Sequence, residues 1–190
     1  MNEPAVTGNA ADGRGSRRAS IVGLGLIGGS IALALRERGW HVTGTDDRPE
    51  VVDAAVERGV IDERGLDAHA AITFIAVPVL GGVDAAQRAL EATNGIVTDV
   101  GSVKAPICTA VSNARFVGGH PMAGSERDGL SGADPNLFEG AIWVLTPDDD
   151  ADDVVFADLA GIIRSLGAEV VAVSAERHDD VVAVVSHVPH

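Results

Sequence analysis

The chain has 190 residues, which is enough for one domain with a genuine core and too short for two full domains. Its content of 46% hydrophobic and 22% charged residues is that of a globular protein and excludes a disordered chain. The net charge of −14 argues against nucleic acid as a partner, because binding to a phosphate backbone depends on clustered basic residues.

Cysteine count and hydropathy restrict the cellular compartment. The single cysteine, Cys108, cannot form a disulfide within the chain, which suits a reducing environment. The N-terminal segment lacks the apolar core of a signal peptide, and no later run approaches the roughly 20 apolar residues of a membrane span. We therefore expect a cytoplasmic protein without a membrane partner.

From Ala19 onward, short apolar runs alternate with amphipathic runs. Residues 1–18 show no periodicity and predict a disordered tail. Strands are predicted at residues 19–23, 41–46, 72–78, 95–101, 115–119, 141–147 and 168–174. Helices are predicted at residues 26–39, 49–59, 79–93, 104–114 and 148–167. This alternation predicts an α/β protein with a doubly wound, mostly parallel sheet and helices on both faces.

Two segments stand apart from this alternation. A polar, Gly-rich loop follows His120 and extends to Gly140. A last helix is predicted to begin at Ser174, which can cap it, and the sequence stops at His190 without a C-terminal cap. We expect residues 174–190 to be the start of a helix that leads into a missing helical domain.

The stretch GLGLIGG places Gly23, Gly25 and Gly28 in the pattern G-x-G-x-x-G, directly after a strand and before a helix. In a dinucleotide-binding loop the first glycine makes a tight turn and the second lets the backbone approach the pyrophosphate. The third lets helix and strand pack closely. The N–H groups at the helix start face the phosphates, so Leu26 and Ile27 belong to the predicted cofactor contacts.

An acidic residue completes this pattern. Asp46 ends the second predicted strand, 18 residues after the last of these glycines, where a carboxylate can bind the adenosine ribose. It would repel a 2′-phosphate, which favours NAD over NADP, although Arg48 could soften that preference. We also assign Val77 and Pro78, at the end of the third strand, to the cofactor site. Residues 19–173 are thus predicted to form a Rossmann-like dinucleotide-binding domain; a structural turn beside a surface acid is the alternative.

The stretch FVGGHPMAGSE places His120 between two glycines and a proline. Pro121 restricts His120 to an extended backbone, and Gly118 and Gly119 are expected to let the chain turn tightly just before it. A histidine held in this way can accept a proton if its pKa lies near the working pH. The alternative is a histidine that ends a strand by chance.

Four stretches, GLGLIGGS, TDVGSVK, GGHPMAGSE and SHVPH, together resemble the prephenate dehydrogenases and the related arogenate dehydrogenases. The resemblance extends from about Ala19 to His190. It implies an NAD(P)-dependent enzyme of tyrosine biosynthesis, in which a Rossmann-like domain precedes an all-helical domain. That helical domain forms the homodimer and completes the active site, and it would begin where this sequence stops.

The implied reaction is the oxidative decarboxylation of prephenate to 4-hydroxyphenylpyruvate. Hydride passes to the nicotinamide as CO₂ departs, and His120 accepts the proton of the substrate hydroxyl. Ser102 is implied as a second catalytic residue that orients the imidazole or touches the hydroxyl, with a helix N-cap as the competing interpretation. Ser125 and Glu126 match a loop at the edge of the substrate.

Further substrate contacts are predicted less directly. Lys104 is the only lysine of the chain and suggests a compact charge near an anion, although chance is a serious alternative. His187 and His190 share one helical face, and the resemblance implies that they line the cleft between the two domains. We expect no metal at this pair. His178 is predicted to be structural or at the surface, and His41 and His69 to have no role.

Several functional alternatives remain open. The substrate could be arogenate, whose side chain differs only in an amino acid group. The chain could be a truncated NAD-binding module without turnover of its own, or a partner chain could supply the helices. A regulatory module that senses the nucleotide and a Rossmann oxidoreductase of simple hydroxy acids are further alternatives. Arg127 is the only arginine near the histidine loop, so the substrate carboxylates lack basic partners, which agrees with an incomplete site.

Overall fold

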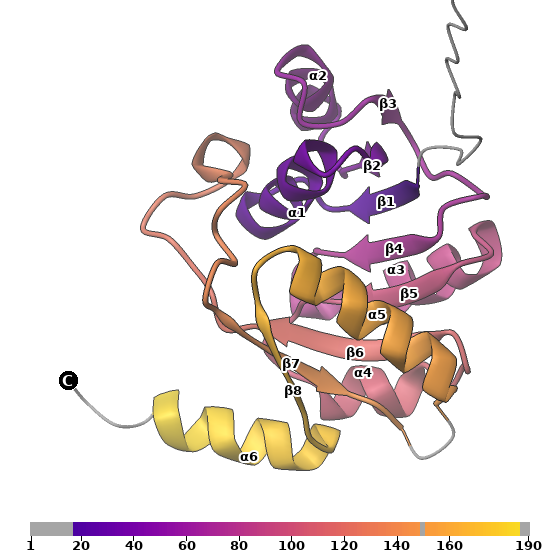
Figure 1. Cartoon of the computed structure of the whole chain (residues 1–190), viewed down its shortest axis with the longest axis vertical. Coiled ribbons are helices and arrows are strands. Elements are labelled where there is room, and N and C mark those ends of the chain that lie inside the picture. Colours follow the sequence, from indigo (N-terminus) through magenta and orange to yellow (C-terminus); the bar gives the residue numbers. More distant parts are fainter. Residues whose placement is uncertain (1–16, 149–150, 187–190) are drawn as a thin grey trace, which may run out of the picture.

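The structure, a computed structural model of the chain, describes residues 17–148 and 151–186, which form an eight-stranded sheet flanked by helices (Figure 1). The strand order is β3-β2-β1-β4-β5-β6-β7-β8. The strands are β1 Arg18–Val22, β2 His41–Thr45, β3 Glu63–Arg64, β4 Ile72–Ile75, β5 Ile96–Asp99, β6 Phe116–Pro121, β7 Ile142–Thr146 and β8 Glu169–Ala172. The helices are α1 Leu26–Glu37, α2 Pro49–Glu57, α3 Val79–Ala92, α4 Ala105–Ala110, α5 Asp153–Ser165 and α6 Ala175–Ser186, with a 3-10 turn η1 at Leu130–Gly132.

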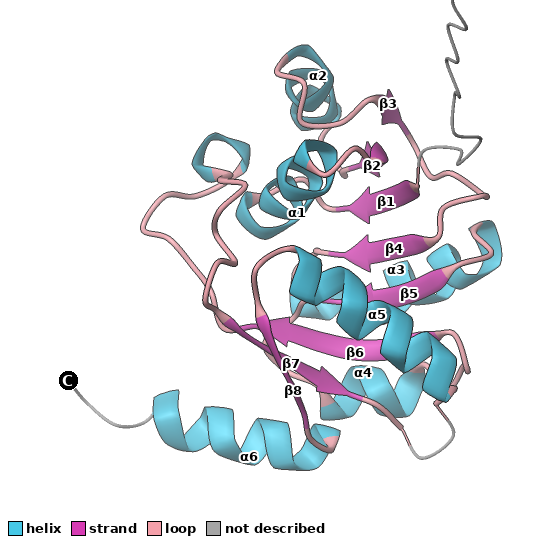
Figure 2. Ribbon diagram, viewed as in Figure 1, coloured by secondary structure: helices cyan, strands magenta, loops and turns pink. Residues whose placement is uncertain are grey.

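Six neighbouring strands, β3, β2, β1, β4, β5 and β6 in their order across the sheet, are all parallel. Strand β7 pairs antiparallel with β6, and β8 runs parallel to β7. The predicted doubly wound, mostly parallel α/β fold with helices on both faces is therefore confirmed (Figure 2). Parallel strands bring their carboxyl ends to one edge, and in such sheets ligands bind at that edge.

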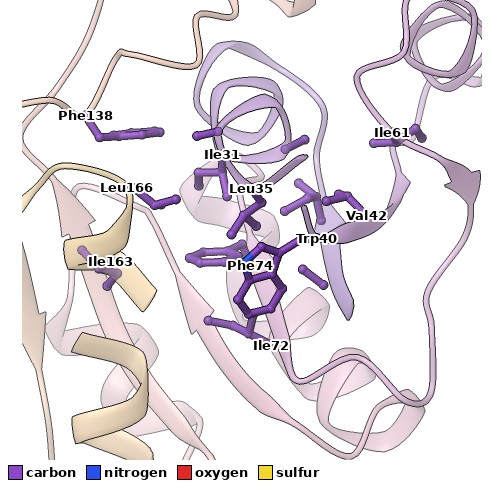
Figure 3. Packing of buried hydrophobic residues seen from close by; sticks show 14 of the residues in the cluster. Ile31, Leu35, Trp40, Val42, Ile61, Ile72, Phe74, Phe138, Ile163 and Leu166 are labelled. Atoms are coloured by element: carbon purple, nitrogen blue, oxygen red, sulfur yellow. The ribbon is translucent and has the colours of Figure 1, made fainter. Parts of the chain in front are cut away.

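Two layers of apolar side chains hold the helices to the sheet. On one face α1, α2 and α5 pack against the strands, and on the other α3 and α4 do so. Neighbouring residues alternate between the layers, as Phe74 and Ile75 of β4 do. Figure 3 shows Ile31 and Leu35 of α1 lying over Phe74. Each such fully buried side chain stabilises the fold by about 1.5–3 kcal/mol.

The structure differs from the predicted elements in three places. Strand β3 was not predicted, because its two residues are exposed and carry no apolar signal. The sheet begins at Arg18, which was assigned to the tail and is ion-paired with Asp67. Strand β6 continues through His120 to Pro121, so the histidine lies in a strand and not in the loop after it. Residues 1–16, the rest of the predicted tail, lie outside the described residues.

The last helix begins as predicted. The hydroxyl of Ser174 accepts a hydrogen bond from the backbone N–H of Arg177 at 3.3 Å, which caps the start of α6. None of the helices in residues 17–148 and 151–186 is both long and apolar enough to cross a membrane.

Candidate active site

The glycine loop joins β1 to α1 at the carboxyl edge of the sheet. Gly23 has a φ of +92°, which favours glycine, and a Cβ on it would lie 2.4 Å from the carbonyl oxygen of Ala76. A Cβ on Gly28 would lie 1.9 Å from the carbonyl oxygen of Gly23. The tight turn and the close packing predicted for these two glycines are confirmed. Around Gly25, no described atom lies within 4 Å of such a Cβ, so its backbone faces open space.

The start of α1 presents backbone donors to this open space. Gly25 is the N-cap and has no side chain to satisfy them. Leu26 and Ile27 open the first turn, whose N–H groups have no partner within the helix. The positive end of the helix dipole also lies here, so this loop suits a pyrophosphate.

Asp46 follows β2 and lies against the glycine loop. Its Oδ2 accepts a hydrogen bond from the N–H of Leu24 at 2.8 Å, and its Oδ1 accepts one from the N–H of Arg48 at 3.1 Å. Burial raises the pKa of Asp46, but these hydrogen bonds outweigh burial and the net pKa is lowered. An ionised carboxylate therefore stands at the position where dinucleotide folds bind a ribose hydroxyl.

The ends of β4 and β5 supply further residues at this edge. Val77 and Pro78 follow β4, and Val77 contacts the glycine loop. Ser102 is exposed in the segment after β5. Helix α4 begins at Ala105 with Lys104 as its N-cap residue, so the helix-cap interpretation of Ser102 is wrong.

His120 lies in β6 opposite Val144 of β7, near the carboxyl end of the strand. Its Nδ1 is 2.9 Å from Nε2 of His178, which belongs to α6. The Nδ1 of His178 is in turn 2.7 Å from Oδ1 of Asp179. The two rings meet edge to face, with centroids 5.1 Å apart, and His178 is only 2% exposed.

The surroundings of His120 keep its ring neutral. Burial lowers the pKa of His120 to about 4, and the neighbouring His178 and Lys104 lower it as well. The expected pKa near the working pH is wrong, because the half-buried ring has lost part of its hydration and lies beside cationic or protonatable groups. At neutral pH the imidazole is therefore free to accept a hydrogen bond or a proton.

Lys104 is buried beneath this histidine. Its amine donates to the carbonyl oxygen of Gly119 at 2.8 Å and forms an ion pair with Asp99. Burial raises the pKa of Asp99, while the Lys104 ammonium opposes that rise. The pair ties β5 to β6 just before His120. Lys104 was expected to meet a substrate anion, but the structure places its fully buried amine inside the protein.

Gly118 and Gly119 do not make the turn that we expected. Both lie in β6 with ordinary negative or extended φ values. A Cβ on Gly118 would lie 2.4 Å from Oγ1 of Thr146, and one on Gly119 would lie 2.8 Å from the carbonyl oxygen of Asp99. These glycines make room for neighbouring strands and for the Lys104 side chain, which fixes the position of the next residue, His120.

The loop after β6 crosses the same edge and returns to α1. Its residues Ser125 and Glu126 are exposed, and the Ser125 hydroxyl accepts a hydrogen bond from the N–H of Arg127. The N–H of Asp134 donates to the hydroxyl of Ser30 at 2.9 Å, which anchors the loop on α1. The role of Ser125 and Glu126 as substrate contacts stays a prediction. His187 and His190 lie outside the described residues.

Sequence reasoning missed His178 and Asp179. His178 was predicted to be structural or at the surface, whereas the structure brings it into contact with His120 across 58 residues of sequence. The adjacent pair His178–Asp179 is visible in the sequence, but nothing local indicates which residue it faces. Only the packing of α6 against β7 and α4 brings the three side chains together.

The glycine loop and His120 occupy one edge of the sheet. Strand β6 is three strand positions from β1, and at about 4.8 Å per position the two features are about 14 Å apart along the edge. A nucleotide laid along this edge from the glycine loop would extend toward His120. The arrangement suits transfer of hydride between a bound dinucleotide and a substrate whose proton is taken by the imidazole.

The chain is similar in sequence and fold to known dehydrogenases. Residues 31–172 match the family described as prephenate dehydrogenase, nucleotide-binding domain. A prephenate dehydrogenase of Bacillus subtilis is 38% identical over 90% of this chain and 50% of its own length. Arogenate dehydrogenase of Synechocystis is 36% identical, with a TM-score of 0.82 over 90% of this chain and 64% of that one.

A third relative was solved with ligands. Prephenate dehydrogenase of Aquifex aeolicus, in complex with hydroxyphenyl propionate and NAD⁺, is 33% identical, with a TM-score of 0.84 over 91% of this chain and 65% of that one. The chain spans about half the length of curated relatives such as the Bacillus subtilis enzyme. By the extent of its match, the chain belongs to the prephenate dehydrogenase family and contains that family's nucleotide-binding domain.

Proposed function

We propose that the protein is an NAD-dependent dehydrogenase that converts prephenate to 4-hydroxyphenylpyruvate by oxidative decarboxylation. The observation that carries this proposal is a neutral histidine, His120, on the same sheet edge as the glycine loop in a chain of this family. The Bacillus subtilis relative is named prephenate dehydrogenase, and the Aquifex aeolicus relative was solved with NAD⁺.

The residues of the glycine loop fit NAD. The backbone at Gly25 is open to a pyrophosphate, and the first N–H groups of α1 are available to it. Asp46 is ionised and would accept hydrogen bonds from ribose hydroxyls, while a 2′-phosphate would be repelled. The Nε of Arg48 lies 3.4 Å from the Asp46 carboxylate, so this cation is already paired, which supports NAD over NADP.

His120 is assigned the proton transfer. NAD, when bound, supplies the hydride acceptor. The bare ring nitrogen of His120 accepts a hydrogen bond from the 4-hydroxyl of prephenate and takes its proton as hydride leaves the carbinol carbon. The bond to the ring carboxylate then breaks, CO₂ departs, and the released electron pair completes the aromatic ring. His120 returns the proton to the phenol oxygen, so the overall reaction consumes and releases no proton.

The test is made on the complete protein. We expect calorimetry to show tighter binding of NAD than of NADP, and prephenate with NAD to yield one NADH and one CO₂ per molecule consumed. A folded protein that binds NAD but forms no NADH from either prephenate or arogenate would contradict the proposal and favour a nucleotide-sensing module.

Arogenate is a second candidate substrate, because the Synechocystis relative is named arogenate dehydrogenase. Both substrates present the same ring hydroxyl and ring carboxylate to His120, so the described residues serve either. The ratio of kcat/KM for prephenate to that for arogenate decides between them: a ratio above 1 supports prephenate.

We propose that residues 19–173 act as the dinucleotide-binding domain of a cytoplasmic homodimer and that a helical region completes the substrate site. The greater length of the relatives supports this. Ser102, Ser125 and Glu126 are the proposed substrate contacts of this domain, together with His187 and His190.

A further inference from the structure

We propose that His178 and Asp179 are positioning residues that set the tautomer of His120, so that its Nε2 is a bare acceptor directed to the substrate hydroxyl. This inference rests on the proposed function for its catalytic consequence, but the tautomer itself can be measured without any substrate. The three side chains form one continuous path, with His120 Nδ1 to His178 Nε2 at 2.9 Å and His178 Nδ1 to Asp179 at 2.7 Å.

The position of each hydrogen follows from the carboxylate end of this path. Burial raises the pKa of Asp179, but hydrogen bonds from the N–H of Ala105 and from His178 outweigh it and the pKa is lowered, so the group is a carboxylate that only accepts. The Nδ1 of His178 must then carry a hydrogen. In neutral His178 the Nε2 is consequently bare and accepts the Nδ1–H of His120, which leaves Nε2 of His120 with its lone pair.

Other contacts leave Nε2 of His120 available. The bond to His178 is the only hydrogen bond of this ring among residues 17–148 and 151–186. The ring is only partly buried, whereas the side chain of His178 behind it is 1% exposed. The side of the ring that faces Nδ1 is therefore closed by protein, and the opposite nitrogen is the one that a substrate can reach.

The carboxylate is held from a second direction. Oδ1 and Oδ2 of Asp179 accept hydrogen bonds from the backbone N–H groups of Lys104 and Ala105, at 2.8 and 2.9 Å. Asp179 thus caps α4 from a different helix and satisfies donors that α4 leaves free. The side chain of the same Lys104 fixes the carbonyl oxygen of Gly119, next to His120. Lys104 and Ala105 therefore hold Asp179 at one end of the path and the residue next to His120 at the other.

This arrangement also stabilises the protonated intermediate. When Nε2 of His120 takes a proton, its Nδ1–H becomes a charge-assisted donor to His178, and the Asp179 carboxylate lies at the far end of that hydrogen-bonded path. Lys104, which disfavours a positive charge on the ring, is itself paired with Asp99. Asp179 is therefore the anion that offsets the positive charge on the imidazole.

Asp179→Asn removes the negative charge. Oδ1 of Asp179 meets two donors, Nδ1–H of His178 and the N–H of Lys104, so the asparagine keeps its oxygen there and directs its amide to the N–H of Ala105. His178 and His120 then keep their hydrogen positions, while the anion at the end of the path is lost. We expect kcat with prephenate to fall only about 5-fold while KM for NAD changes little, since the glycine loop is untouched.

His178→Phe is the second variant, and it leaves the cap on α4 intact. Phe fills the space of the ring but accepts no hydrogen bond, so the Nδ1–H of His120 loses its acceptor and the tautomer is no longer held. We expect a larger fall in kcat, about 10-fold or more, and a shift in the acidic limb of the kcat–pH profile. A merely structural role would give the opposite order, because Asp179→Asn disturbs the cap on α4 and His178→Phe does not.

The tautomer is read from ¹⁵N NMR of the histidine rings in the 190-residue chain. We expect His120 to be protonated on Nδ1 in the wild type and in Asp179→Asn, and mostly on Nε2 in His178→Phe, where Nδ1 has lost its acceptor. His69→Gln, which changes an exposed histidine, is the matched control and should alter only its own signals. A wild-type His120 protonated on Nε2 would overturn the inference, whatever the activity. Correct tautomers in a protein without dehydrogenase activity would instead refute the proposed function alone.

Discussion

The glycine loop and the histidine site lie on one edge of one sheet but are specified differently. The loop requires residues without a side chain: a Cβ on Gly23 or Gly28 would lie 2.4 Å or less from a backbone carbonyl oxygen. The histidine site depends on side chains that must be present, and they come from β5, β6, α6 and the residue just before α4. A binding loop built from absent side chains is visible in a short pattern, whereas a buried polar path needs partners that only the fold brings together.

The largest effect that separates the two regions is expected from His120→Asn. Asn can fill part of the space and form a hydrogen bond, but it cannot take a proton. We expect kcat to fall about 10²- to 10⁴-fold, with NAD affinity and thermal stability little changed. Steady-state kinetics and calorimetry on the same preparations measure both quantities.

His69→Asn serves as the control, since His69 is exposed and its backbone N–H, not its ring, donates a hydrogen bond to Asp67 within the part of the chain that the structure describes. If His120→Asn weakened NAD binding as strongly as turnover, the two regions would not be independent and His120 would be a folding residue.

The next effect tests what Lys104 does. Replacing Lys104 by Met leaves Asp99 buried without its cation, so we expect a loss of about 3–5 kcal/mol in the free energy of unfolding. Urea denaturation measures it. The double variant Lys104→Met with Asp99→Asn should recover part of this loss, because a neutral amide is less costly to bury than an unpaired carboxylate.

The same variants decide between the sequence prediction and the structure for Lys104. If Lys104→Met had normal stability but a strongly raised KM for prephenate, the amine of Lys104 would be a substrate contact, as the sequence predicted. Reduced stability with an unchanged KM would establish it as the brace between β5 and β6.

The sequence was sufficient for the parts of the molecule whose cause is local. Periodicity predicted most of the strands and helices, and the spacing of Gly23, Gly25 and Gly28 predicted the tight turn between β1 and α1. It was insufficient where a residue's role depends on distant partners. Lys104 was predicted to meet an anion and does so, but the anion is Asp99 inside the protein. His178 was set aside because its partner lies 58 residues away.

The glycine loop itself offers a smaller and sharper comparison, between Gly25→Ala and Gly28→Ala. A methyl group on Gly25 meets no described atom within 4 Å, so stability should be unchanged while NAD affinity falls about 10-fold or more, because the pyrophosphate loses its close approach. A methyl group on Gly28 would lie 1.9 Å from a carbonyl oxygen, so we expect loss of NAD binding and about 1–3 kcal/mol of stability. Equal melting temperatures for the two variants would contradict the packing role of Gly28.

The smallest expected effect is the contribution of His120 to the pH dependence of stability. Its pKa is lowered from 6.5 to about 4 by burial and by its neighbours. The unfolded chain therefore binds a proton at this residue before the folded protein does, and stability is fully present above about pH 6.5 and falls as the pH drops toward 4. Because the ring is only partly buried, solvent screening reduces this loss to about 1 kcal/mol.

This contribution is obtained by difference. The pKa values of Asp46, Asp62, Asp67 and Asp179 are also lowered, so acid weakens the fold through them in both the wild type and His120→Asn. The loss due to His120 lies mostly between pH 6.5 and 4, above the range in which those carboxylates titrate. Urea denaturation at half-unit steps should therefore show a shallower slope for His120→Asn in this window alone. Identical slopes would mean that the imidazole is as hydrated in the folded protein as in the unfolded chain. Burial of the ring would then not distinguish the histidine site from the open glycine loop.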